Sequence, residues 1–190
     1  MRVAAHYLAW LVGLAKPETQ TTEREWDRLA HYAQGRRQLV EIGVWHGVTT
    51  TRLRKAMDRE GEISAVDPYP VGRLGLNLQE RIAKREAESV PRGRLRWLKT
   101  TGERAAAGHP PVDFIFIDGN HSEAGLLADW RAWSGLVSRG GLVALHDSHS
   151  TPSRPIDDAG SVKVTNEVIL PDPRFELVEV IDSLTVLRRR

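Results

Sequence analysis

Two stretches of the sequence decide the fold: Val112-Asp113-Phe114-Ile115-Phe116-Ile117-Asp118-Gly119-Asn120-His121 and Gly141-Leu142-Val143-Ala144-Leu145-His146-Asp147-Ser148. Each is a run of apolar, strand-forming residues that leads to an aspartate, as is typical of strands buried on both faces of a parallel sheet. Ligands of open α/β sheets bind beyond the carboxyl ends of the strands. We therefore expect Asp118 and Asp147 to form a candidate site for a divalent cation, with His121 three residues past the first aspartate.

The size and composition favour one soluble domain. With 190 residues, the chain is long enough to bury about 70% of its unfolded surface. The apolar and charged fractions, 41% and 27%, are ordinary for a globular protein. The formal charge of +2 is too small to indicate a nucleic-acid partner. The absence of cysteine excludes disulfides and thiol chemistry and is compatible with the cytoplasmic location that we expect.

The N-terminal segment is apolar between Val3 and Leu14, so a signal peptide has to be considered. However, His6 and Tyr7 interrupt the segment, it is too short to span a bilayer, and no small-residue cleavage site follows. We expect an amphipathic helix that ends before Pro17, and no membrane association. Its apolar face requires a partner, either the flank of this domain or a second subunit. Residues 1–37 are therefore predicted to be N-terminal helices that serve as a lid or as the contact of a homodimer.

The rest of the chain alternates strands and helices. After a helix at 23–33, strands are predicted at 38–42, 62–66, 95–99, 113–117 and 142–145, and helices at 48–59, 74–89, 103–107, 122–138 and 161–169. Two last strands, 175–181 and 184–187, form a hairpin. This order predicts a doubly wound, Rossmann-like α/β fold for residues 38–190, with a seven-stranded, mostly parallel sheet and a C-terminal antiparallel hairpin.

The first predicted strand, turn and helix start read Leu39-Val40-Glu41-Ile42-Gly43-Val44-Trp45-His46-Gly47-Val48-Thr49-Thr50. The two glycines let the backbone approach a ligand, and the helix start offers free N–H groups to an anion. The Gly-x-x-x-Gly spacing is neither the dinucleotide nor the phosphate-loop pattern, so an ordinary strand-to-helix turn is equally compatible with it. Asp67, which ends the next strand, is placed to accept hydrogen bonds from a ribose.

The glycine turn, Asp67 and the later Thr101-Gly102-Glu103 together resemble class I S-adenosylmethionine-dependent methyltransferases over residues 38–147. The resemblance implies that Glu41, Gly43 and Gly47 line the methionine end of the cofactor. It places Thr49 at the methionine carboxylate and Asp67 at the ribose. The full set of cofactor-binding residues that it implies is Glu41, Gly43, Gly47, Thr49, Asp67, Tyr69, Gly102, Glu103 and Asp118, with Tyr69, Gly102 and Glu103 near the adenine. Trp45 and His46 replace smaller residues; they roof the cofactor or meet the acceptor, or Trp45 simply packs.

The second half of the chain resembles the metal-dependent O-methyltransferases, a branch that includes catechol enzymes and enzymes acting on macrolide sugars such as macrocin. The resemblance implies that Asp118 and Asp147 bind Mg²⁺ or another divalent cation and that His121 is the general base. His146 is either a second catalytic residue or a structural histidine that points away from Asp147. Ser148 stands where many relatives have another aspartate or an asparagine.

We therefore expect an enzyme that transfers a methyl group from S-adenosylmethionine to a hydroxyl oxygen of a small molecule. The chain has only three phenylalanines and three tyrosines, and its 150–158 loop is polar, which favours a saccharide acceptor over a flat catechol. Two alternatives remain open: a hydroxylase-like relative on the same scaffold, and a non-catalytic cofactor-binding or dimerising protein. An RNA methyltransferase is disfavoured because no basic stripe interleaved with aromatic residues appears outside the segment Arg81–Lys99, whose charges are typical of a solvated face.

Overall fold

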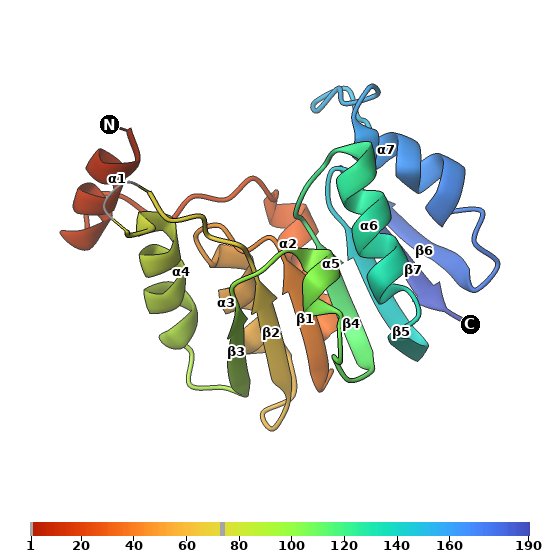
Figure 1. The fold of residues 1–190 in the computed structure, drawn as a ribbon, viewed down its shortest axis with the longest axis horizontal. Helices are drawn as coiled ribbons and strands as arrows, with labels where there is room; N and C mark the ends of the chain where they lie inside the picture. The colour runs from red at the N-terminus through yellow and green to blue at the C-terminus, as the bar shows by residue number, and fades with distance from the viewer. Residues whose placement is uncertain (1, 73–74) are drawn as a thin grey trace.

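A single sheet forms the centre of the computed structural model, which describes residues 2–72 and 75–190. The strands lie in the order β3-β2-β1-β4-β5-β7-β6 (Figure 1). Strands β1 to β5 are parallel, and β7 pairs antiparallel with both β5 and β6. The bounds are β1 (Gln38–Ile42), β2 (Glu62–Val66), β3 (Arg94–Leu98), β4 (Val112–Ile117), β5 (Val137–Leu145), β6 (Phe175–Ile181) and β7 (Leu184–Arg189).

Helices cover both faces of the sheet (Figure 1). Helices α2 and α3 pack on one face, whereas α6 and α7 pack on the other. Among the described residues, no helix is both long and apolar enough to cross a bilayer. The bounds are α1 (Arg2–Leu11), α2 (Glu23–Ala33), α3 (Val48–Ala56), α4 (Leu78–Glu88), α5 (Gly102–Ala105), α6 (Glu123–Trp133) and α7 (Gly160–Val164), followed by a π-helical turn (Thr165–Ile169).

Strand β4 is continuously apolar from Phe114 to Ile117 because both of its faces are buried there. Phe114 and Phe116 belong to the core that contains Leu29 of α2 and Leu53 of α3. Their neighbours Ile115 and Ile117 belong to the core on the opposite face, with Trp130 and Trp133 of α6. Because successive side chains point to opposite faces and both faces are covered, polar alternation is lost.

The N-terminal region contacts the sheet in two different ways. Helix α1 lies at the outer side of α4, where the Trp10 indole donates a hydrogen bond of 2.8 Å to Glu86. Helix α2 is part of the core through Leu29 and Ala33. The chain that joins them passes above the carboxyl ends of the strands (Figure 1). Residues 12–22, which we call the strap, therefore lie where a ligand of the sheet is expected.

The predicted fold class is confirmed, and the clearest difference lies between α6 and β5. The helix ends at Trp133, whereas Val137, predicted as helical, already pairs with Val112 in the sheet. Gly140 adopts a positive φ of 76° inside β5, next to an irregularity in its register with β4, so the strand continues through a glycine pair that resembles a turn. The predicted helix start at residue 74 lies outside the described residues, and α4 begins at Leu78.

Candidate active site

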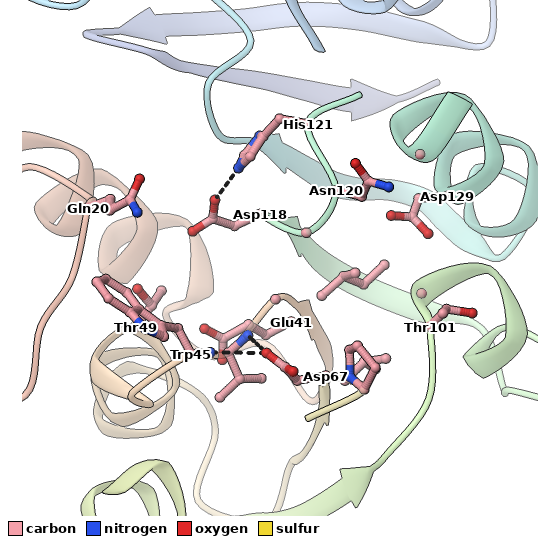
Figure 2. A pocket seen from close by; sticks show the side chains of 18 of the residues that line it. Gln20, Glu41, Trp45, Thr49, Asp67, Thr101, Asp118, Asn120, His121 and Asp129 are labelled. Atoms are coloured by element: carbon pink, nitrogen blue, oxygen red, sulfur yellow. Dashed lines mark hydrogen bonds and ion pairs between the residues drawn. The ribbon is translucent and has the colours of Figure 1, made fainter. Parts of the chain in front are cut away.

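A cavity of about 540 Å³ opens at the carboxyl ends of β1, β2 and β4, within the size range of small-molecule sites. Figure 2 shows side chains from these three strand ends around it. The sequence-predicted residues that line the cavity are Glu41, Gly43, Thr49, Asp67, Gly102, Glu103, Asp118 and His121. The structure thus brings Asp118 and His121 to the same cavity as the predicted cofactor-binding residues.

The turn after β1 is held by glycine and by Asp67. Gly43 has a φ of 86°, and a Cβ atom there would lie 2.0 Å from the backbone oxygen of Asp118, so only glycine fits. Asp67 accepts hydrogen bonds from the backbone N–H groups of Val44 at 3.0 Å and Trp45 at 3.2 Å. The same carboxylate that faces the cavity therefore fixes the turn that forms its floor.

Glu41 is almost completely buried beside two other carboxylates. Burial raises its pKa well above the usual value, and the nearby Asp118 and Asp67 add to the increase, although the Thr50 hydroxyl donates to it. The carboxyl group of Glu41 therefore ionises less readily than an ordinary glutamate where it faces the cavity.

Two predicted cofactor-binding residues do not line the cavity. Gly47 begins α3 with a φ of 73°, and its Cα faces the backbone of Ala83 in α4. Tyr69 is 4% exposed, and its hydroxyl donates a hydrogen bond of 3.0 Å to the carbonyl of Trp45. Both residues contact other parts of the protein behind the cavity surface. They therefore support the wall of the cavity and do not line it.

Asp118, His121 and His146 converge beyond the end of β4, in the region that we call the acceptor side. The Nδ1 atom of His146 lies 2.8 Å from Asp118 Oδ1, and His121 Nε2 lies 3.4 Å from the same oxygen. Strand β5 ends at Leu145, so the alternation of side chains between the two faces no longer applies to His146. The chain turns at Asp147, which has a φ of 49°, and His146 points toward the site. Unlike His121, His146 does not line the cavity and is 2% exposed.

Glu25 of α2 completes this cluster and was not predicted from the sequence. It is fully buried, accepts hydrogen bonds from the backbone and hydroxyl of Ser183 at 2.9 and 2.8 Å, and lies 3.6 Å from His146 Nε2. The Thr22-x-x-Glu25 capping box was the available signal, because Glu25 also accepts from the N–H of Thr22. That signal indicates a helix start and does not reveal the long-range contact with His146.

The charges of the cluster stabilise one another. Burial works to raise the pKa of Glu25, but contacts with His146, Thr22 and Ser183 lower the pKa to about 2. Burial works to lower the pKa of His146, but Asp118 and Glu25 raise the pKa to about 10. For Asp118, contacts with His121 and His146 outweigh burial, so its pKa lies below the usual value. His146 is thus a buried imidazolium between two carboxylates.

Asp147 lies beside the cluster but is already paired with a cation. Both of its carboxylate oxygens contact the Arg154 guanidinium, each at 2.5 Å. Its oxygens lie 3.7 Å from His146 and 4.0 Å from His121, and it does not line the cavity. Ser148 is buried, and its hydroxyl hydrogen-bonds Leu145, Ser183 and Thr185, away from the acidic pair.

The structure adds lining residues that the sequence analysis missed. Glu18, Thr19 and Gln20 of the strap lie on the cavity wall, as does Asp129 of α6. The strap is fixed because the Glu18 N–H donates a hydrogen bond of 3.0 Å to the buried His46, whose pKa burial lowers to about 4. No local pattern indicated these contacts.

One histidine outside the site is buried although it belongs to no sequence motif. His109 is only 9% exposed. Its Nε2 atom lies 3.0 Å from the Ser64 hydroxyl in β2, and its ring packs edge-on against Trp133. It therefore has a structural place in the core.

Comparisons with known proteins agree with this architecture. A doubly wound sheet with a ligand cavity beyond β1, β2 and β4 defines a Rossmann-like α/β protein. A family described as a methyltransferase domain matches residues 40–148, more than half of the chain. The chain therefore belongs to this methyltransferase-domain family.

Solved structures of similar fold come from several bacteria. A protein from Corynebacterium glutamicum has a TM-score of 0.70 and 18% identity, with 100% of this chain and 90% of that one covered. The O-methyltransferase TomG from Streptomyces achromogenes, involved in tomaymycin synthesis and solved with S-adenosylmethionine, has a TM-score of 0.66 and 13% identity, with 98% and 87% covered. An O-methyltransferase from Bacillus cereus, solved with S-adenosylhomocysteine, has a TM-score of 0.63 and 16% identity, with 100% and 91% covered.

At these identities the structural likeness shows the fold alone. No curated protein sequence gives a significant match. The donor, the acceptor and the metal must therefore be argued from this chain's own residues.

Proposed function

We propose that this protein transfers the methyl group of S-adenosylmethionine to a hydroxyl oxygen of a small molecule. The observation that carries the proposal is the convergence of Asp118 and His121 on the same cavity that the Gly43 turn and Asp67 form. The two O-methyltransferases of similar fold, solved with the donor and with its product, support the choice of reaction.

The cofactor half of the cavity suits a ligand with a sulfonium and an amino group. Asp67 lines this half and Asp118 lies at its border with the acceptor side, whereas the raised pKa of Glu41 makes that carboxyl group harder to ionise. A carboxylate close to the sulfonium lowers the free energy of the bound cation most where water is excluded. Thr49, at the start of α3, is placed for the methionine carboxylate.

His121 is the proposed general base. The acceptor oxygen attacks the methyl carbon as the carbon–sulfur bond breaks, and the hydroxyl proton passes to His121 Nε2. The products are a methyl ether and S-adenosylhomocysteine. Asp118, 3.4 Å from Nε2, stabilises the imidazolium that forms.

The acceptor side offers carboxylate oxygens to a divalent cation. Asp118, His121 and His146 each have an atom that can face a common ion, and these atoms lie within 4.8 Å of one another. His146 is protonated and His121 is the proposed base, so the carboxylates are the ligands in this proposal. We propose that Asp118 and Asp147 hold Mg²⁺ or another divalent cation, which when bound would make the acceptor hydroxyl more acidic. Binding at Asp147 has to compete with Arg154.

We propose a saccharide as the acceptor and the strap as a lid. The polar 150–158 loop follows Asp147, and its Arg154 lies 3.4 Å from Gln20 of the strap. These two segments therefore meet beside the acceptor side and present polar groups to a polyhydroxylated ligand. The exposed apolar side chains of α1, including Leu8 at 61%, support a homodimer contact, which light scattering after gel filtration would test.

The decisive experiment is a transfer assay with isotopically labelled S-adenosylmethionine, saccharides, phenols and catechols, each with Mg²⁺, Mn²⁺ or a chelator. We expect labelled methyl ethers from saccharides and a lower rate with the chelator. Binding of the donor without transfer to any acceptor would contradict an enzyme and favour the non-catalytic alternative. Transfer undiminished by the chelator would remove the metal from the proposal.

A further inference from the structure

Asp129 is an acidic residue in an unusual place. It lies in α6 among the core residues Leu126, Trp130 and Trp133, and it is only 5% exposed. Among the residues that the structure describes, no cationic side chain lies within ion-pair distance of it, in contrast to Asp118 and Asp147. The carboxyl group accepts a hydrogen bond from the Glu103 backbone, but no cation balances its charge, which is costly in a buried place. Its position on the cavity wall leaves it accessible to a donor group of a ligand.

The carboxyl group of Asp129 lies between two turns that form one end of the cavity. A Cβ atom on Gly102 would lie 2.3 Å from Asp129 Oδ1, and one on Gly119 would lie 3.7 Å from Asp129 Oδ2. Gly102 begins α5 after β3, and Gly119 follows β4. The absence of side chains at both glycines gives the carboxyl group access to the cavity between them.

This end of the cavity suits a flat aromatic ring. Ile42, Val66 and Pro68 supply apolar lining, and Thr101 also lines the cavity. Figure 2 shows Asp129 and Thr101 on one side of the cavity and Trp45 and Thr49 on the other. Asp67, the proposed ribose ligand, lies between the two ends. An adenosyl group bound to Asp67 therefore extends its base toward Asp129.

The pKa of Asp129 is compatible with a hydrogen bond to the edge of an adenine ring. Burial raises the pKa of its carboxyl group to about 6, and the nearby Glu103 carboxylate contributes, whereas the Glu103 backbone opposes the shift. A carboxyl group accepts a hydrogen bond when ionised, and when protonated it offers one donor and one acceptor. The adenine edge presents an amino donor beside a ring-nitrogen acceptor, which either form can bind.

We propose that Asp129 is the residue that recognises the exocyclic amino group of the cofactor's adenine. The assignment rests on the proposed function, because it requires an adenosyl cofactor in this cavity. It makes α6, a helix of the acceptor half, responsible for selecting the nucleobase, in addition to the loop residues Gly102 and Glu103.

The test is a calorimetric comparison of two ligands. One is S-adenosylhomocysteine, and the other is its 6-deamino analogue, in which hydrogen replaces the adenine amino group. Wild-type protein should bind the first roughly tenfold to a hundredfold more tightly, since a hydrogen bond to a charged group is lost with the second. Asp129→Ala should bind both ligands with similar affinity.

Two further variants keep the result interpretable. Asp129→Asn offers both a donor and an acceptor, so it should retain a preference for the amino ligand and should fold even if Asp129→Ala does not. Asp27→Asn changes an exposed aspartate on α2 and should leave both affinities unchanged.

The outcomes separate the two proposals. If wild-type protein binds neither ligand, the adenosyl cofactor and this assignment both fail. If it binds both and Asp129→Ala weakens them by the same factor, Asp129 has a structural role or binds the methionine amine, and only this assignment is overturned. An unchanged preference in both Asp129 variants would overturn it as well.

Discussion

The cofactor half of the cavity and the acceptor side next to it balance the charges of their carboxyl groups differently. In the cofactor half, Asp67 accepts backbone N–H groups, burial raises the pKa of Glu41, and Asp129 has no cationic partner among the described residues. On the acceptor side, Asp118 faces two histidines, and Asp147 is paired with Arg154. The cofactor half is therefore prepared for a ligand that brings its own positive charge, whereas a cation on the acceptor side has to compete with the protein's own cations.

The largest expected effect is on the acceptor side. His121→Ala should lower the turnover number roughly 10²–10⁴-fold, the usual contribution of a general base, while the affinity for S-adenosylhomocysteine stays unchanged. Steady-state kinetics and calorimetry measure the two quantities. His149→Ala, which removes an exposed histidine beyond β5, is the control. Loss of cofactor affinity in His121→Ala would show that His121 serves cofactor binding and would contradict its role as the general base.

The next effect is on the cofactor half. Gly43→Ala should lower the free energy of unfolding by about 3 kcal/mol and abolish cofactor binding, because its Cβ would collide with the Asp118 backbone at a positive φ. Gly108→Ala is matched in φ, at 71°, but has open space around it, so it should cost only about 1 kcal/mol. Urea denaturation measures both. Equal losses of unfolding free energy in the two variants would show that the close contact of Gly43 with the Asp118 backbone does not determine the effect.

A smaller effect concerns stability and pH. The pKa of His146 is about 10 in the folded protein and near 6.5 in an unfolded chain, so its stabilisation is complete below about pH 6.5 and is lost as the pH rises through 10. The advantage of wild-type protein over His146→Gln should therefore fall by more than about 1.4 kcal/mol between pH 6 and pH 10. Urea titrations at the two pH values, with exposed His31→Gln as a control, measure this difference. A difference that does not change with pH would argue against a buried imidazolium.

The smallest effect tests the competition at Asp147. Arg154→Ala should raise the affinity for Mn²⁺ roughly fivefold, because partly exposed ion pairs contribute only about 1 kcal/mol. Electron paramagnetic resonance of free Mn²⁺ measures the affinity, and Arg188→Ala, which breaks an exposed pair with Glu176, is the comparison. Unchanged or weaker binding in Arg154→Ala would mean that Asp147 is not a ligand.

Local patterns predicted the scaffold better than they predicted the partners of its side chains. Strands β1, β2 and β6 agree residue for residue with the predictions, since burial on both faces or regular alternation leaves a local signal. Asp118 and His121 were identified because they follow a strand end. Glu25 and Asp129 were not, because each lies on a helix far along the chain from the residues that it meets.

The same limit applies to two residues that the resemblance assigned to the cofactor and that do not line the cavity. The hydroxyl of Tyr69 has an internal partner in Trp45. Gly47, at its positive φ, lies against the backbone of α4. Which face of a turn is open depends on the packing of neighbouring helices, and the spacing of residues in one sequence does not contain that information.

The most direct test of the central claim is a crystal structure of the protein with S-adenosylhomocysteine and Mn²⁺. We predict the sulfur atom of the product beside Asp118, the ribose at Asp67, and an anomalous peak for the metal between Asp118 and Asp147. A ligand outside this cavity, or a metal peak remote from both aspartates, would contradict the account.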